Sequence, residues 1–189
     1  MNFLIVVAAY ILAHGVTALV VTPVQTIFMP EYTVFASLIY LPHGVRVLAT
    51  WAFGWKAIPA LIIGVYMSAW VFSPTHDLDL LKPALIMGIL VGAFSAFLAF
   101  ELVRRVGYDG YFGRSVNLNW KAMIIIGTIS SIINSVGQTL VYSGLLGLDR
   151  MPVSLVIFAV GDLVGLIVCM VVLMFCFRWF RWFSLARRN

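Results

Sequence analysis

Two full charges of opposite sign lie inside otherwise apolar stretches of this sequence, and they are the residues best suited to do chemistry. Arg46 lies near the middle of an apolar run at about 32–54, and Asp162 lies near the middle of another at about 152–177. If both runs cross a membrane as helices, both charges lie near mid-depth, where a charge is costly and usually faces a partner or a cavity. We therefore predict that Arg46 and Asp162 face each other or share a ligand, with Arg46 neutralising an anionic group and Asp162 orienting Arg46.

Two amide side chains add hydrogen-bonding capacity at a similar depth. Asn134 and Gln138 lie midway along the apolar run at about 122–146. They could complete a polar pocket around the two charges by supplying hydrogen bonds. The alternative is a structural ion pair that pins two helices together, since a paired buried charge is already satisfied and does not by itself indicate a site.

The run that carries Arg46 also contains a helix breaker and a flexible residue, in the sequence Leu41-Pro42-His43-Gly44. Unwound backbone is tolerated at membrane depth only where protein or a water-filled cavity satisfies it. Broken helices of this kind build binding sites in transporters. We therefore predict a break near Pro42 and Gly44, with a simple proline kink as the alternative. His43 could be a pH-sensitive group, a hydrogen-bonding partner of freed carbonyls, or a ligand contact.

Catalytic and metal-binding patterns are weak in comparison. The sequence contains no nucleophile–base constellation and no paired carboxylates, so we expect no enzyme activity. His14 and His43 lie on neighbouring segments and could form one axial pair for haem, but there is no second histidine pair, and His76 lies beside Asp77 and Asp79 in a charged loop. We therefore predict neither a metal site nor a cofactor.

The composition identifies the medium in which these side chains lie. Hydrophobic residues make up 63% and charged residues 10% of the 189 residues, against about 45–50% and about 25% in soluble domains. With a mean hydropathy of +1.07, this balance excludes a soluble enzyme, a disordered chain and a nucleic-acid-binding module. We predict an integral membrane protein that is embedded in the lipid bilayer and contacts lipid as a partner.

Six apolar segments are candidates to cross the ~30 Å hydrocarbon core as helices. We therefore predict an all-α fold, a bundle of six transmembrane helices with the second broken near Pro42, in a single domain over residues 1–189. The predicted helices lie at about 2–21, 32–54, 57–72, 83–102, 122–146 and 152–177. The first run lacks the basic region of a signal peptide and is long enough to span, so we expect it to be retained.

Lysine and arginine residues are strongly biased to one side of this arrangement. Only Lys82 and Arg150 fall on the side opposite the termini, whereas nine fall on the same side as the termini: Lys56, Arg104, Arg105, Arg114, Lys121, Arg178, Arg181, Arg187 and Arg188. Because such residues mark cytoplasmic loops, we predict that both termini are cytoplasmic.

Small residues recur at four-residue spacing in four of the predicted helices. Such stripes let helix backbones approach closely in lipid. They indicate a compact bundle, or else a docking face for another subunit. The residues are Ala9 and Ala13, Gly88 and Gly92, Gly127 and Ser131, and Gly161 and Gly165.

The stretch from Leu41 to Gly44, followed by Gly54, Pro59 and Gly64, resembles the MASE1 integral membrane sensory domain. That family carries a proline-x-glycine element followed by glycine, proline and glycine at similar spacing in its early helices. The later Gly161-Asp162-Leu163-Val164-Gly165 is similar to its glycine–aspartate motif. The resemblance implies a bacterial inner-membrane sensory or ligand-binding module.

The resemblance also suggests, by analogy of fold, the six-helix substrate-binding components of energy-coupling-factor transporters. The Ala9 and Ala13 stripe is similar to the docking stripe in their first helix. His43 and Arg46 stand where small or apolar residues are expected in MASE1 domains, which suggests a different or an anionic ligand. Any signalling output is then expected on another polypeptide.

These observations favour a stand-alone, non-enzymatic membrane module that binds a small molecule, such as an anion, or a partner helix through its polar layer, in a sensor or solute-binding role. An accessory or assembly subunit of a larger membrane complex, with a membrane protein as partner, is the first alternative. A component of a small-solute transporter is the second. If the protein is a sensor, we expect a discrete site around Arg46 and Asp162. If it is a subunit, we expect a dry and fully paired polar layer. If it is a transporter, we expect a route from the polar layer to both faces.

Overall fold

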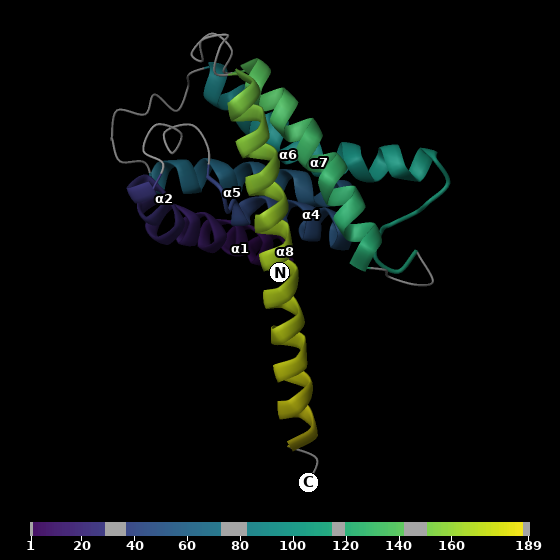
Figure 1. Cartoon of the computed structure of the whole chain (residues 1–189). Helices are drawn as coiled ribbons and strands as arrows, with labels where there is room; N and C mark the ends of the chain where they lie inside the picture. Colours follow the sequence, from purple (N-terminus) through teal and green to yellow (C-terminus); the bar gives the residue numbers. More distant parts are fainter. Residues whose placement is uncertain (1, 29–36, 73–82, 115–119, 142–150, 187–189) are drawn as a thin grey trace.

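The computed structural model describes residues 2–28, 37–72, 83–114, 120–141 and 151–186, and within these ranges the chain is mostly helical and contains no strand (Figure 1). The prediction of an all-α fold is therefore confirmed for this part of the chain. In chain order the elements are α1 (Asn2–Val16), the π-helical turn η1 (Thr17–Val21), α2 (Thr22–Phe28), α4 (Leu41–Phe53), the short 3-10 turn η2 (Gly54–Lys56), α5 (Ala57–Phe72), α6 (Pro83–Arg105), α7 (Trp120–Val141) and α8 (Met151–Ala186).

Five helical runs within the described residues are long and apolar enough to cross a membrane: Asn2–Phe28, Leu41–Phe72, Pro83–Arg105, Trp120–Val141 and Leu155–Trp179. The chain thus has the character of a multi-pass membrane protein. The predicted number of six is not confirmed, because the second and third predicted segments form one run joined by η2.

The direction of α4 along α1 follows from their contacts. Near the start of α4, the Leu41 amide donates to Thr17 Oγ1 over 3.3 Å. Further along, Arg46 donates to the Tyr10 hydroxyl over 2.9 Å. As α4 advances, its partners on α1 move back toward the N-terminus, so the two helices run in opposite directions.

The chain then reverses at η2, so that α5 follows α1 in the same direction. Gly64 of α5 packs against Tyr10, and Phe72 packs against Gly15. Gly54 permits the reversal because its φ of +59° is a left-handed conformation, which side chains with a Cβ rarely adopt.

Pro42 begins a helix instead of interrupting one. The helix α4 starts at Leu41 with Pro42 in its first turn, and residues 37–40 before it are not helical. Proline suits this place because its ring fixes a helical φ and its missing N–H would have no intrahelical partner. A break with helix on both sides is not confirmed, since 32–36 lie outside the described residues.

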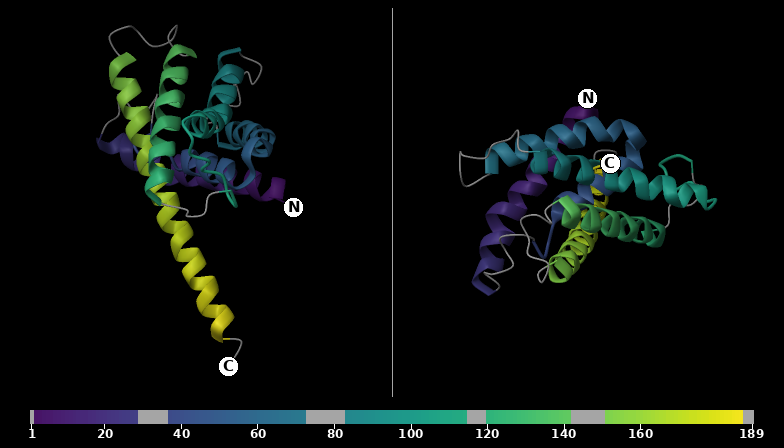
Figure 2. Two further views of the ribbon diagram at one scale, coloured as in Figure 1. Left: turned by 90° about the vertical axis from the view of Figure 1, so that its right-hand side faces the viewer. Right: turned by 90° about the horizontal axis from the view of Figure 1, so that it is seen from above.

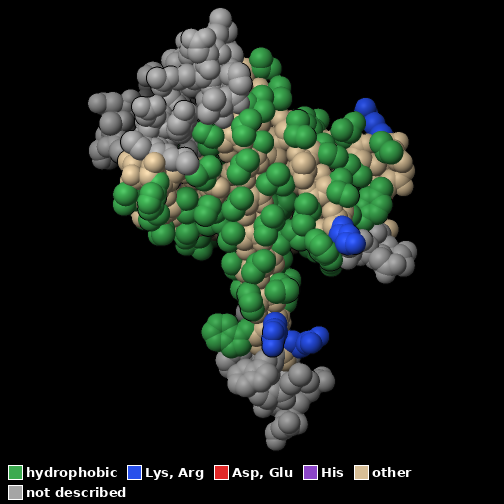
Figure 3. All heavy atoms as spheres, viewed as in Figure 1, with side chains coloured by type: hydrophobic (Ala, Val, Ile, Leu, Met, Phe, Trp, Pro, Cys, Tyr) green, Lys and Arg blue, Asp and Glu red, His purple; other side chains and the backbone are tan. Residues whose placement is uncertain are grey.

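The helix α8 is longer than predicted and extends away from the rest of the molecule. Its 36 residues amount to about 54 Å at ~1.5 Å per residue. Figures 1 and 2 show its C-terminal half projecting beyond the other helices. On the face in Figure 3 the described surface is mostly apolar, and basic side chains lie toward the lower end of α8 and at the right edge.

Two apolar clusters enclose α4. One lies between α1, α4 and α5 and is built on the fully buried Tyr10 and Leu61. The other lies between α4, α6, α7 and α8 and is built on Phe100 and Leu166. Because α4 contributes to both clusters, its polar residues lie at the centre of the fold.

The predicted small-residue stripes pack largely within the chain. Ala9 and Ala13 are half-buried, whereas the glycines and the serine of the other stripes are buried. Gly92 faces the guanidinium of Arg46, and Gly127 faces Leu166. The buried stripes therefore serve contacts within this chain, and Gly161 and Gly165 face the non-helical backbone before α4.

Candidate functional site

The five predicted site residues lie together in one buried cluster. Arg46 and His43 come from α4, Asn134 and Gln138 from α7, and Asp162 from α8. The exposed fractions are 3% for Arg46, 0% for His43, 2% for Asn134 and 1% for Asp162. Residues separated by more than a hundred positions in the sequence thus form one polar centre inside an apolar fold.

The guanidinium of Arg46 is held by neutral groups. Its Nη2 donates to the hydroxyl oxygens of Tyr10 over 2.9 Å and Tyr40 over 3.4 Å, and its Nη1 donates to Asn134 Oδ1 over a long 3.5 Å. Its Cζ lies 5.7 Å and 5.3 Å from the centroids of the two tyrosine rings, within range of a cation–π attraction. Its Nε is buried and has no hydrogen-bond partner.

Arg46 and Asp162 do not pair directly. No ion pair among the described residues joins them, because Asn134 lies between the two charges. Its Oδ1 accepts from Arg46 and, over 3.4 Å, from Gln138 Nε2, while its Nδ2 donates to Asp162 Oδ2 over 2.8 Å. Arginine can only donate, so it fixes the orientation of the amide. The predicted facing pair is thus a bridged one.

His43 occupies the position beside the carboxylate. Its Nδ1 lies 3.3 Å from Asp162 Oδ2, an ion-pair distance without hydrogen-bond alignment. Its Nε2 lies 3.3 Å from the carbonyl oxygen of Gly127 on α7. His43 therefore faces an acceptor through each ring nitrogen.

Two backbone amides of the non-helical residues 37–40 donate to polar groups from distant parts of the chain. The Tyr40 amide donates to the Gly161 carbonyl over 2.9 Å. The Leu38 amide donates to Gln25 Oε1 over 2.7 Å. Together with the bond from Leu41 to Thr17, these contacts give protein partners to three backbone amides at the start of α4.

The glycine–aspartate motif in α8 provides the room for this irregular backbone. A Cβ at Gly161 would collide with the carbonyl oxygen of Ser37, and a Cβ at Gly165 with that of Tyr40. A Cβ at Gly44 would lie 2.5 Å from the Cβ of Cys169. The motif thus positions Tyr40 and, through Asp162, also Asn134.

Sequence reasoning missed several members of the site. Tyr10 and Tyr40 bind Arg46, their hydroxyl oxygens lie 3.3 Å apart, and Thr17 and Gln25 hold the backbone before α4. The available signal was the presence of a polar side chain inside an apolar run. Tyrosine and threonine are common enough in membrane helices that this signal does not single them out.

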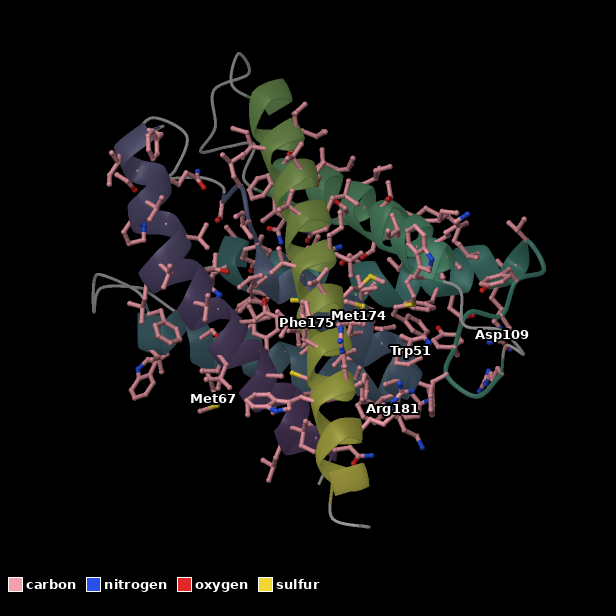
Figure 4. The ribbon with its side chains drawn as sticks, turned by 60° about the horizontal axis from the view of Figure 1, so that its bottom comes forward. Trp51, Met67, Asp109, Met174, Phe175 and Arg181 are labelled. Carbon is pink, nitrogen blue, oxygen red and sulfur yellow. The ribbon has the colours of Figure 1, made fainter. Side chains whose placement is uncertain are left out.

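A second polar cluster joins the last turns of α6 to the loop that follows it. Tyr111 is buried and donates to Glu101 Oε1 over 2.9 Å, and Asp109 lies 3.7 Å from Arg114 Nη1. Burial, and then the bond to Glu101, raise the pKa of Tyr111. The Phe112 amide donates to the Trp51 carbonyl over 3.0 Å. The cluster fastens the loop to the end of α4 (Figure 4, where Trp51 and Asp109 are labelled).

Within the described ranges, no group of three or more histidine, cysteine, aspartate or glutamate residues is arranged to hold a metal ion. In comparisons with known proteins, no protein-family model, no curated protein and no solved structure matches this chain. Function therefore has to be inferred from the buried cluster itself.

Proposed function

We propose that this chain is a non-enzymatic membrane module that binds a small anion at Arg46, in a sensor or solute-binding role. One observation carries the proposal. Arg46 as a whole is only 3% exposed, yet every group that its guanidinium contacts by a hydrogen bond is neutral.

A buried charge raises the free energy of the folded state unless it is paired and hydrogen-bonded. Asp162 is separated from Arg46 by Asn134 and lies beside His43. The tyrosine rings and hydroxyls offset only part of the cost. An anion in direct contact with the guanidinium would lower the free energy of the centre, and its oxygens could also accept from the hydroxyls of Tyr10 and Tyr40.

The space around the guanidinium limits the size of that anion. A Cβ built on Gly92 would lie 2.7 Å from Arg46 Nη2, so α6 packs closely against one side. Tyr40 and His14 are only half-buried, and their rings lie 6.4 Å apart. A carboxylate or an ion of similar size, approaching past Tyr40, suits this arrangement better than a bulky ligand.

We also infer six crossings of a bacterial inner membrane, with both termini in the cytoplasm. The opposite directions of α4 and α5 support counting them as two crossings. Their connecting turn carries Lys56, and the bond from Phe112 to Trp51 brings the basic loop after α6 to the same end. The bacterial membrane rests on the resemblance to MASE1 domains alone.

The second candidate function is an accessory subunit of a larger membrane complex. The projecting half of α8 favours it, because Val172, Met174, Phe175 and Phe177 are all more than half exposed. A partner helix could cover these side chains, as lipid also could. A component of a small-solute transporter remains the third candidate, and it requires passage of the bound anion to both faces.

Native mass spectrometry of the protein, extracted gently at endogenous expression, tests the proposal. We expect a small acidic molecule to be retained by the wild type, lost from Arg46→Gln, and retained by Arg104→Gln, a matched change at an exposed arginine. Anion binding would be refuted if the wild-type protein carries no small molecule and if formate, acetate and chloride do not raise its melting temperature. A defined heteromeric mass would instead favour the accessory subunit.

A further inference from the structure

We propose that His43 and Asp162 together form a proton-binding site at membrane depth, in which the pair holds one proton more than a neutral imidazole and a carboxylate do. The proposal goes beyond the anion site at Arg46 and does not depend on it. It follows from which atoms in the buried cluster can donate and which can only accept.

The orientation of Asn134 shows which hydrogen bond the Asp162 carboxylate accepts. Arg46 has donors only, so the atom of Asn134 that faces it is the oxygen, and the Asn134 nitrogen must face Asp162. This nitrogen lies 2.8 Å from Asp162 Oδ2. Oδ2 therefore accepts a hydrogen bond on that side.

The partners of the His43 imidazole indicate which of its ring nitrogens carries a proton. His43 Nε2 faces the Gly127 carbonyl oxygen, which can only accept, so Nε2 carries a proton. His43 Nδ1 faces Asp162 Oδ2 at 3.3 Å. If Nδ1 were unprotonated and Asp162 ionised, a nitrogen lone pair would lie 3.3 Å from a charged oxygen, with side chains only 0% and 1% exposed. Two acceptors so close and so deeply buried repel each other.

Two proton positions resolve this conflict, and both give the pair the same proton count. Either Nδ1 is protonated, which makes an imidazolium beside a carboxylate, or Asp162 is protonated and donates to Nδ1. The bond from Asn134 to Oδ2 favours the imidazolium form, because an ionised oxygen is the stronger acceptor. In either form the pair is neutral as a whole.

The groups that surround the pair are consistent with this assignment. The charged groups acting on His43 are Asp162 from α8 and Arg46 from its own helix. The nearby side chains of α7 are neutral: Asn134 Nδ2 donates to Asp162 Oδ2, and Ser131 Oγ donates to the Ala159 carbonyl over 3.1 Å. From α1, Tyr10 bonds to Arg46, and from α8, Cys169 donates to the Leu41 carbonyl over 3.3 Å.

A neutral pair leaves the positive charge of Arg46 uncompensated by Asp162. Loss of the proton would give the cluster a negative charge beside Arg46 and would weaken the attraction for an anion. Proton binding at His43 and Asp162 and anion binding at Arg46 should therefore favour each other, as linkage requires. This coupling rests on the proposed function, whereas the proton site itself does not.

Nitrogen-15 NMR of histidine-labelled protein tests the proton site. The variant His14→Phe with His76→Gln leaves His43 as the single histidine, and a phenylalanine at position 14 retains a ring against Phe72, where the present ring centroids lie 5.8 Å apart. We expect His43 to show two protonated ring nitrogens at neutral pH. One protonated nitrogen, together with the infrared band of a protonated carboxyl group that Asp162→Asn removes, would place the same proton on Asp162.

One protonated nitrogen without a protonated carboxyl group would overturn the proposal. In the same background, Asp162→Asn should leave His43 neutral, because the charged partner is gone. Ser131→Ala, which alters a neighbour of the same carboxylate, should leave the doubly protonated state intact. A doubly protonated His43 that persists unchanged in Asp162→Asn would refute a shared proton, and the parent spectrum remains decisive even if Asp162→Asn does not fold.

Discussion

The packing of Gly161 against the chain before α4 predicts a large effect from a very small substitution. In Gly161→Ala the added methyl group would collide with the Ser37 carbonyl oxygen. That atom belongs to the backbone, so it cannot move aside as a side-chain end can. Alanine is intrinsically favoured over glycine in a helix by up to about 1 kcal/mol. A loss of stability would therefore result from displacement of the segment 37–41 and not from a lower helix propensity of α8.

The magnitude follows from the contacts that the segment 37–41 would lose. Its bonds to Gly161, Gln25 and Thr17 have lengths of 2.9, 2.7 and 3.3 Å, and each contributes about 1 kcal/mol net. Overpacking costs about 1–3 kcal/mol in addition. If the segment relaxes in part and helix propensity offsets about 1 kcal/mol, the free energy of unfolding falls by about 2–4 kcal/mol. For a chain of this size that corresponds to a melting temperature lower by roughly 4–16 °C.

The assay is thermal unfolding in detergent, followed by intrinsic fluorescence on samples that elute as a single species. The matched control is Gly15→Ala, a buried helical glycine whose added Cβ would lie 2.8 Å from Cζ at the tip of the Phe72 ring. Because that ring is half-buried and can turn, the control should change stability by less than about 1 kcal/mol. Equal melting temperatures for the two variants would refute the role assigned to Gly161.

Three further variants test the polar network and the loop. Asn134→Leu removes the bridge between Arg46 and Asp162 and should cost about 2–4 kcal/mol in a thermal melt; a wild-type melting temperature would show that the bridge is energetically silent. Arg46→Ala and Asp162→Ala should each destabilise the protein by removing a hydrogen bond to Asn134. Because both bonds meet at Asn134, the double variant should lose less than the sum of the two single losses; strictly additive losses would contradict this coupling. Tyr111→Phe should cost about 1–2 kcal/mol through the lost bond to Glu101. Because burial raises the pKa of Tyr111 in the folded state, wild-type stability should fall as the pH rises past about 10, where unfolded tyrosine ionises. The stability of Tyr111→Phe should fall less over the same range. Identical alkaline stability profiles of the two proteins would contradict a raised pKa of Tyr111.

The central part of the site was predictable because its residues are expensive to bury. A charge or an amide in an apolar run requires partners, so Arg46, Asp162 and Asn134 could be expected to meet without knowledge of the fold. The exact pairing was not predictable, because it depends on how each helix is rotated about its axis. Asn134 stands between the charges, and His43 takes the place beside the carboxylate, as a result of that rotation.

The start of α4 was harder to predict for a different physical reason. The residues that satisfy the preceding backbone, Thr17 and Gln25, lie 24 and 13 positions away in the sequence, so no local pattern indicates them. The sequence predicted a break at Pro42, which is not confirmed, because a proline suits the first turn of a helix as well as a kink. The glycine motif predicted close packing, whereas its partner is an irregular backbone and not the face of another helix.

The adjacency of Gly161 and Asp162 gives a mechanical reason for the motif. One turn of α8 holds Tyr40 through the Gly161 carbonyl and holds Asn134 through the Asp162 carboxylate. Tyr40 and Asn134 are in turn two of the three hydrogen-bond partners of Arg46. A displacement of α8 relative to α4 must therefore change the surroundings of Arg46 from both sides at once. Gly161→Ala should accordingly weaken retention of an anion at Arg46, although Gly161 itself makes no hydrogen bond to the guanidinium, and Gly15→Ala should not.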